Sequence, residues 1–152
     1  MLNKALIICF IIFLLCAAIL PAQTAAEMES ILNSKAVNYG QAALFVIASA
    51  GNANNIITQQ AAFNMALTNG WIPKDAVIND PIKLGKLSFL IMEAFDMKGG
   101  LMYSILPGPR YAFRSLESRS VIQGIIDPGM TVSGEWFLRI LGNVLNIAED
   151  DK

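Results

Sequence analysis

The chain has 152 residues, of which 55% are hydrophobic and 15% are charged, and its formal net charge is −1. Such a near-neutral charge provides no electrostatic footprint for nucleic acid, and the absence of histidine excludes serine triads, Cys-His dyads and histidine-based zinc sites. The length suits one domain with a real core and is too short for two of ordinary size.

Residues 1–26 predict a cleavable secretory signal peptide. Lys4 supplies the positive charge, residues 5–20 form an uninterrupted apolar run, and small residues follow. The run is shorter than the roughly 20 residues that span a bilayer as a helix, which favours a signal over a retained anchor. We expect cleavage after Ala26, with Ala22 as the alternative site, and a mature protein in the periplasm or elsewhere outside the cytoplasm.

The two cysteines, Cys9 and Cys16, both lie in this N-terminal segment. The bulky Leu15 before Cys16 does not fit a lipoprotein signal, which has a small residue there. A chain cut after residue 26 therefore has no disulfide, thiol nucleophile or thiolate metal ligand. No serine is followed by lysine three residues later, which excludes a Ser-x-x-Lys nucleophile. We expect neither an enzyme nor a bound cofactor or metal.

The remaining chain is predicted to form helices, the first of which is a short helix over 29–35. Asn38 and Gln41 fit a capping box for the next helix, which Gly51-Asn52 can close with a left-handed turn. A further helix is expected over 58–69.

A middle helix is predicted after Asp80-Pro81, which would provide an N-cap and a first-turn proline, and Gly99-Gly100 would end it. One face of this helix carries Leu84, Leu87, Ile91, Ala94 and Phe95. Short extended pieces are expected over 102–106.

Two more helices complete the predicted domain. The first covers 109–121, with Pro109 acceptable in its first turn. The second is marked by a continuous apolar stripe, formed by Trp136, Phe137, Ile140, Leu141, Val144 and Leu145. No sustained alternation of period two is present, so the sequence predicts an all-α domain over 27–147 and an acidic tail over 148–152.

Several of these segments repeat. Residues 37–47, 82–92 and 131–141 align without gaps, so that their glycines coincide: Gly40, Gly85 and Gly134. Residues 62–73 also align with 112–123. The period of about 45 to 50 residues is typical of repeated supersecondary units.

This pattern of a glycine-containing helix start, a variable loop and an Ala-containing second helix resembles the S-layer homology (SLH) repeat, best over 110–135. The resemblance covers 37–146, about two and a half repeats. It implies a bundle of helical hairpins that binds cell-wall polysaccharide or peptidoglycan. The family's Thr-Arg-Ala-Glu motif matches 38–41, 83–86 and 132–135, where no copy keeps the arginine and only Glu135 keeps the acid.

The candidate ligand-binding residues are Arg110, Arg114, Arg119, Trp71 and Glu135, the last of which keeps the acid of the family motif. Arg110 and Arg114 are spaced to share a helix face, with Arg119 beyond them, and could bind carboxylates or phosphates of a wall polymer. The alternative is an ordinary pair between Arg114 and Glu117.

The two tryptophans have different expected roles. Trp71, at a helix end, could stack on a sugar ring or fill the core, whereas Trp136 is assigned to the core.

The longest connection, 98–110, could be a partner-binding loop or a cover over Phe95 and Phe113. Taken together, the sequence predicts an exported, non-enzymatic module of the cell envelope that binds cell-wall polymer. The alternative is a scaffold or adaptor that binds an envelope protein.

Overall fold

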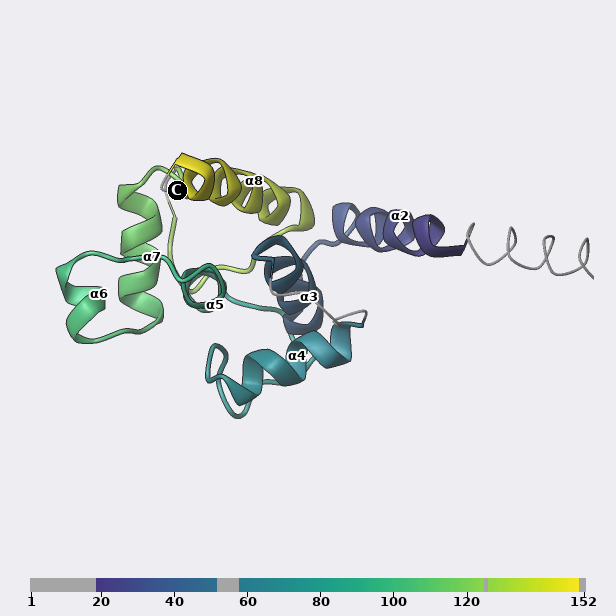
Figure 1. Ribbon diagram of the computed structural model, residues 1–152, viewed down its shortest axis with the longest axis horizontal. Coiled ribbons are helices and arrows are strands. Elements are labelled where there is room, and N and C mark those ends of the chain that lie inside the picture. Colours follow the sequence, from purple (N-terminus) through teal and green to yellow (C-terminus); the bar gives the residue numbers. More distant parts are fainter. Residues whose placement is uncertain (1–18, 52–57, 125, 151–152) are drawn as a thin grey trace, which may run out of the picture.

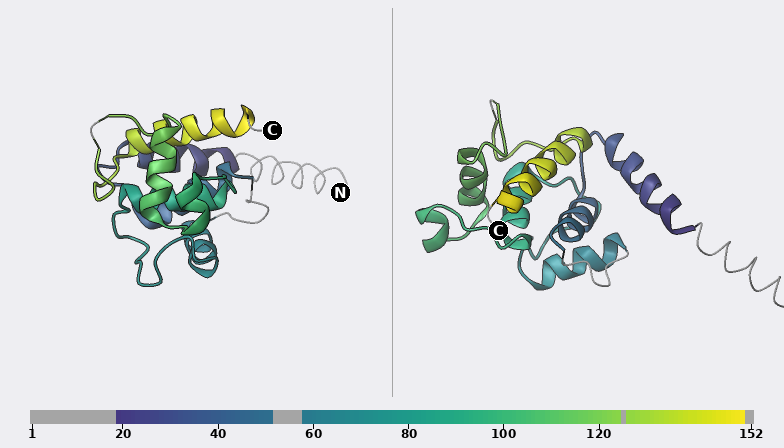
Figure 2. Two further views of the ribbon diagram at one scale, coloured as in Figure 1. Left: turned by 90° about the vertical axis from the view of Figure 1, so that its left-hand side faces the viewer. Right: turned by 45° about the horizontal axis from the view of Figure 1, so that its top comes forward.

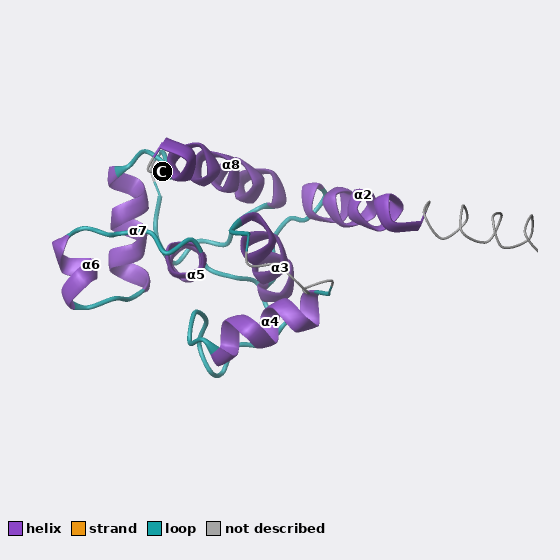
Figure 3. Ribbon diagram, viewed as in Figure 1, coloured by secondary structure: helices purple, strands orange, loops and turns teal. Residues whose placement is uncertain are grey.

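The computed structural model describes residues 19–51, 58–124 and 126–150, and within these ranges it contains seven helices and no strand (Figures 1 and 3). The predicted all-α class is therefore confirmed. The helices are α2 (Ile19–Leu32), α3 (Tyr39–Ser49), α4 (Gln59–Thr68), α5 (Leu84–Ala94), α6 (Leu101–Ile105), α7 (Pro109–Ser118) and α8 (Gly134–Asp150).

The helices pack mainly as neighbouring pairs. α3 packs against α4, α5 packs against α7, and α3 also contacts α5. The C-terminal end of α2 lies beside the start of α8, and α2 then extends away from the bundle (Figures 1 and 2). The small helix α6 projects at the opposite end of the molecule, next to α7 (Figure 1).

Helix α3 begins with the predicted capping box. The Asn38 side chain accepts a hydrogen bond from the backbone N–H of Gln41 at 2.8 Å, and the Gln41 side chain accepts one from the backbone N–H of Asn38 at 3.1 Å. Both N–H groups lie at the helix start, where no helical carbonyl can reach them. The predicted closing turn is also confirmed at Gly51, whose φ is 77°, while Asn52 lies outside the described residues.

The substitution Asn38→Ala is expected to lower the free energy of unfolding by about 1 kcal/mol, because it removes the side-chain oxygen that caps α3. Chemical denaturation followed by circular dichroism measures this change. Asn38→Ser is the matched control, since serine can accept the same hydrogen bond and should cost only a few tenths of a kcal/mol. Equal losses for the two variants would contradict the capping role.

The starts of α3, α5 and α8 meet through their backbones. Val37 donates from its N–H to the Val132 carbonyl at 2.8 Å, and Ile82 donates to the Val37 carbonyl at 2.9 Å. Isolated antiparallel bridges join Asn38 with Pro81 and Lys83 with Thr131. The side chains of Val37, Ile82 and Val132 are fully buried. These three short segments thus place three helix starts around one point of the core.

The glycines do not hold equivalent places in these starts. Gly40 and Gly85 are the second residues of their helices, whereas Gly134 is the first residue of α8. The ungapped alignment is therefore out of step by one residue in the third segment. The buried residues that precede the helices and the backbone bridges set the register, so Val132 and not Thr131 takes the place of Val37 and Ile82.

The second pair of aligned segments has the same burial and turn geometry in both members. Ala62 and Phe63 of α4 are buried, as are Ala112 and Phe113 of α7. A residue with positive φ lies two residues after the end of each helix, and the next N–H donates to a helical carbonyl, at 2.9 Å in one segment and 3.0 Å in the other. In the first segment Gly70 has the positive φ, and the Trp71 N–H donates to the Ala66 carbonyl. In the second segment Ser120 has the positive φ, and the Val121 N–H donates to the Leu116 carbonyl.

The predicted bounds were wrong around the middle helix. α5 begins at Leu84 with Lys83 as its N-cap, because Pro81 is held in the bridge to Asn38 and cannot start the helix. α5 also ends at Ala94, before Gly99-Gly100. The segment predicted to be extended, 102–106, is mostly helical and belongs to α6.

The two ends of the described chain differ from expectation in a similar way. The short helix predicted over 29–35 is the end of the longer α2, which stops at Leu32. α8 continues to Asp150, so 148–150 of the predicted tail are helical, and 151–152 lie outside the described residues.

Helix α2 runs through both expected cleavage sites, after Ala22 and after Ala26. Its buried anchor is Ile31, whereas Met28 and Leu32 are exposed. Cleavage at either site would leave Ile31 in place beside α8.

None of the helices in the part of the chain that is described has the length and apolar character to cross a membrane. Residues 1–18, which hold most of the predicted signal peptide, are not described, so that prediction stays a prediction.

Candidate functional site

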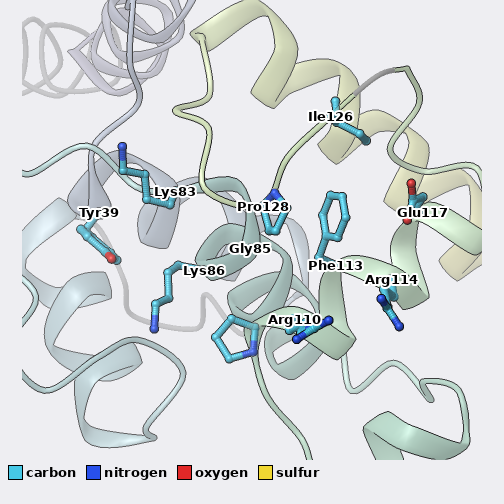
Figure 4. Close-up of a pocket in the computed structure, with 11 residues that line it drawn as sticks. Tyr39, Lys83, Gly85, Lys86, Arg110, Phe113, Arg114, Glu117, Ile126 and Pro128 are labelled. Atoms are coloured by element: carbon cyan, nitrogen blue, oxygen red, sulfur yellow. The ribbon is translucent and has the colours of Figure 1, made fainter.

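A pocket of about 690 Å³ lies between the starts of α5 and α7 (Figure 4). The loop before α8 forms another side, and the first residue of α3 contributes as well. Its lining residues are Tyr39, Lys83, Gly85, Lys86, Pro109, Arg110, Phe113, Arg114, Glu117, Ile126 and Pro128.

Two of the pocket cations come from α7. Pro109 is the first residue of this helix, and Arg110 and Arg114 follow one turn apart. Ala112, Phe113 and Leu116 turn the other face of the helix into the core. Because this amphipathic packing fixes the rotation of α7, both arginines are exposed along the pocket.

The other two cations come from the start of α5. Lys83 is the N-cap, with an extended backbone, and Lys86 lies in the first turn. Gly85 lies between them and allows a close approach of the loop before α8. Its N–H donates to the Pro128 carbonyl at 2.8 Å, and a Cβ at this position would lie 3.1 Å from the Pro128 Cβ. The contact draws 126–128 against α5 and so forms one wall of the pocket.

The pocket is positively charged, although the chain as a whole is not. It is lined by four cationic side chains and one carboxylate, that of Glu117. The aromatic rings of Tyr39 and Phe113 add apolar surface. Burial, and then the charges of Asp75 and Asp80, raise the pKa of Tyr39, so its hydroxyl stays protonated at neutral pH and is able to donate a hydrogen bond. Such a lining suits a ligand that carries negative charge on an otherwise sugar-like or apolar body.

The structure brings together only part of the predicted site. Arg110 and Arg114 line the pocket, whereas Arg119, Trp71 and Glu135 are not among its lining residues. The guanidinium of Arg119 donates a hydrogen bond to the Lys98 carbonyl. Trp71 is half-buried and packs against the core, and Glu135 is exposed in the first turn of α8.

The side chains of Arg114 and Glu117 extend in different directions from α7 (Figure 4). Arg114 lines the pocket together with Arg110, which lies one turn earlier on α7. Trp136, which the sequence assigns to the core, is half-buried and packs against it.

Four residues that line the pocket were not predicted as site residues from the sequence: Lys83, Lys86, Tyr39 and Phe113. One signal was present: two lysines, three residues apart, at the start of a predicted helix and inside a segment that matches the family motif. Nothing in the sequence, however, places the start of α5 beside the start of α7.

A second, smaller pocket of about 140 Å³ is lined by Trp136, Arg139 and Asn143 of α8, together with Val121, Gln123 and Ile140. The Asn143 side chain donates to the Val121 carbonyl at 3.0 Å and so uses its amide for packing α8 on the turn after α7. Over 19–51, 58–124 and 126–150 no three histidine, cysteine or acidic side chains are grouped so that they could hold a metal ion.

Comparisons with protein-family models, with curated proteins and with solved structures found no match to this chain.

Proposed function

We propose that this protein is an exported, non-enzymatic module of the cell envelope that binds an anionic cell-wall polymer in the pocket between α5 and α7. The polymer is peptidoglycan or an associated polysaccharide. The observation that carries the proposal is that four cationic side chains, those of Lys83, Lys86, Arg110 and Arg114, line one pocket in a chain of nearly neutral charge.

The chemistry of the lining supports a polymer with carboxylate or phosphate groups. Arginine can contact either group with two parallel hydrogen bonds, while lysine attracts it as a point charge. Tyr39 and Phe113 are buried to more than nine-tenths, and the small part of each ring that lines the pocket gives it an apolar wall. The pocket volume, about 690 Å³, is large enough for a sugar unit with its charged substituent.

The arrangement of the helices supports an SLH-like repeat fold. We infer that α3 with α4 forms one helical hairpin unit, α5 with α7 a second, and α8 the half unit that completes about two and a half repeats. In support, the three helix starts share buried residues and backbone bridges, and the ends of α4 and α7 share one turn geometry.

The cations of the pocket could take over the role of the arginine that the family motif lacks in this chain. None of the three matching segments keeps the motif arginine, but 83–86 carries a lysine at each end, and both lysines line the pocket. Together with the α7 arginines they supply positive charge where the motif arginine is lost. The proposed binding thus depends on cations other than the arginine of the family motif.

The double substitution Arg110→Gln with Arg114→Gln is expected to weaken binding to purified peptidoglycan sacculi roughly tenfold or more, because two charge-assisted contacts are lost. Co-sedimentation at low and at high salt measures the effect, and binding of the unsubstituted protein should fall as salt rises. The matched control is Lys35→Gln with Lys74→Gln, which removes two exposed cations that do not line the pocket. The glycan proposal would be contradicted if both double variants bound sacculi equally weakly, or if the unsubstituted protein did not co-sediment with sacculi.

A protein scaffold or adaptor is the second candidate, and the exposed apolar residues of α6 favour it. Crosslinking in the source cell, compared between the unsubstituted protein and the Arg110/Arg114 variant, separates the two candidates: a protein partner retained by both, without sacculus binding, supports the scaffold. Release of muropeptides from sacculi by the purified protein would contradict the non-enzymatic proposal.

A further inference from the structure

The two proposed helical units, α3 with α4 and α5 with α7, differ in charge at matching positions. Their backbones agree there: the Gly85 N–H donates to the Pro128 carbonyl at 2.8 Å in the second unit. In the first unit the Gly40 N–H donates to the Ile78 carbonyl at 2.9 Å. The first sequence alignment, and the second one continued back to the helix starts, pair Lys83 with Asn38, Lys86 with Gln41, Arg110 with Gln60 and Arg114 with Asn64. Each cation of the pocket therefore has a neutral amide as its counterpart.

The amides of the first unit serve its local structure. Asn38 and Gln41 form the capping box of α3, and the Gln60 amide donates to the Asn64 side chain at 3.0 Å. The cations at the matching positions do not have this role. The side chain of Lys83, the N-cap of α5, makes no capping hydrogen bond. The two arginines of α7 cannot bond to each other, because a guanidinium only donates.

The cations of the second unit lie where a helix gains nothing from positive charge. Arg110 and Arg114 are four residues apart on α7, and two like charges at this spacing destabilise a helix. Lys83 and Lys86 lie at the start of α5, where the positive end of the helix dipole disfavours cations. Because the first unit forms the same local structure with neutral residues, the fold does not require these charges. A negatively charged ligand gives a physical reason for them.

The acidic residues around the pocket offset only part of this charge. Glu117 is the one acid among the lining residues, against four cations. Asp75 and Asp80 are close enough to raise the pKa of Tyr39, and Asp127 accepts a hydrogen bond from the backbone of its own turn at 2.6 Å. None of these three aspartates is a lining residue of the pocket. A ligand therefore has to bring more than one negative charge to balance the lining.

The arrangement of the cations as two pairs, one on each helix, favours a chain of charges over a single charged group. A carboxylate offers one charge and two oxygens, which the fork of one arginine already fills. A phosphodiester-linked polymer carries a negative charge in every linkage, so successive linkages can meet successive cations. Both lysine and arginine bind phosphate, lysine as a point charge and arginine with two parallel hydrogen bonds.

We propose that the pocket binds a wall polysaccharide whose units are joined by phosphodiester linkages, and that it contacts more than one phosphate at once. The lysine pair of α5 and the arginine pair of α7 bind different phosphates of the same chain. This inference rests on the proposed function, which it narrows from anionic wall polymers in general to those with phosphate in the backbone.

Removal of phosphate from the wall tests this inference separately from the proposed function. Sacculi that carry wall teichoic acid are compared with the same sacculi after hydrofluoric acid, which cleaves phosphodiesters and leaves peptidoglycan. Co-sedimentation of the full chain should weaken roughly tenfold or more on the treated sacculi, because the charge-assisted contacts to phosphate are lost. Equal binding to both preparations would overturn the phosphate inference and leave the proposed function standing. Binding to neither would overturn both.

Competition with soluble ligands tests the contact with several phosphates. Released wall teichoic acid should displace the protein from untreated sacculi roughly ten times better, per negative charge, than glycerol 3-phosphate, because only the polymer reaches both pairs of cations. Polygalacturonate, a chain of carboxylates, is the control and should compete poorly at the same charge concentration. Equal competition by glycerol 3-phosphate would overturn the contact with several phosphates, and equal competition by polygalacturonate would overturn the choice of phosphate.

The first unit supplies variants that are compatible with the fold. Lys83→Asn with Lys86→Gln copies the capping box of α3 onto α5, so the thermal unfolding midpoint should not fall. Binding of this variant to teichoic acid sacculi should nevertheless weaken roughly tenfold or more, because two cations are lost. Unchanged binding would overturn the role of the lysine pair.

The charge-matched control adds Gln60→Arg and Asn64→Arg to the same variant. These changes return the net charge of the chain but place it on α4, at the positions that match the arginines of α7. Binding should stay weak, because the added charges do not line the pocket. Restored binding would show that net charge alone attracts the polymer, and it would overturn the proposal.

Discussion

The substitution Phe137→Ala is expected to lower the free energy of unfolding by about 3–5 kcal/mol, the largest loss for a single residue of α8. Phe137 is fully buried, and its ring contacts Phe45 of α3 edge to face, with centroids 6.4 Å apart and planes at 86°. Alanine would remove this ring pair and leave a cavity between the two helices. Urea unfolding followed by circular dichroism measures the change.

Leu145→Ala is the matched control for this prediction. Leu145 belongs to the same helix and to the same predicted stripe, but it is 37% exposed. Its truncation should cost less than about 1 kcal/mol, because surrounding water and mobile side chains fill the space. Similar losses at the two positions would show that α8 does not pack on α3 through Phe137.

The substitution Gly134→Ala should destabilise the fold by about 3 kcal/mol or more, at the upper end for overpacking, because no space exists for even a methyl group at the start of α8. A Cβ on residue 134 would lie 1.6 Å from the carbonyl oxygen of Ile31. The obstacle is backbone, so it cannot turn aside as a side chain would. The end of α2 would have to leave α8, and the hydrogen bond from the Gly134 N–H to the Ser34 carbonyl, 2.9 Å long, would be lost.

Gly142→Ala, in the same helix, is the opposite case. A Cβ there meets nothing within 4 Å, so alanine adds helix propensity without a clash and should stabilise the protein by about 0.5–1 kcal/mol. Thermal denaturation of the two variants should therefore move the midpoint in opposite directions. A destabilised Gly142→Ala, or an unchanged Gly134→Ala, would contradict the close approach of α2 and α8.

Local sequence signals predicted the helices whose ends depend on neighbouring residues. The capping box of Asn38 and Gln41 is such a case, because both partners lie within one turn. The same holds for Pro109, which begins α7 as expected. The alternation of buried and exposed residues in α8 follows the predicted stripe from Phe137 to Val144.

Predictions from neighbouring residues were wrong where backbone contacts between segments distant in the sequence set the position of a helix start. Asp80-Pro81 reads as a helix start, yet Pro81 is bridged to Asn38 and the helix begins three residues later, at Leu84. Likewise, the glycine alignment placed Gly134 one residue out of register, since Gly134 is needed for its contact with Ile31 and not for the role of Gly40 or Gly85. A sequence comparison cannot tell these two uses of glycine apart.

The sequence by itself determined the all-α class, the positions of α3, α4, α7 and α8, and the shared face of Arg110 and Arg114, because each follows from the periodicity and capping of a single helix. Only the tertiary structure decided that Lys83 and Lys86 join those arginines, since that depends on how α5 packs on α7 and on the approach of Pro128 to Gly85. It also decided that Leu101 and Ile105 face outward, because the buried contacts of Tyr103 set the rotation of α6.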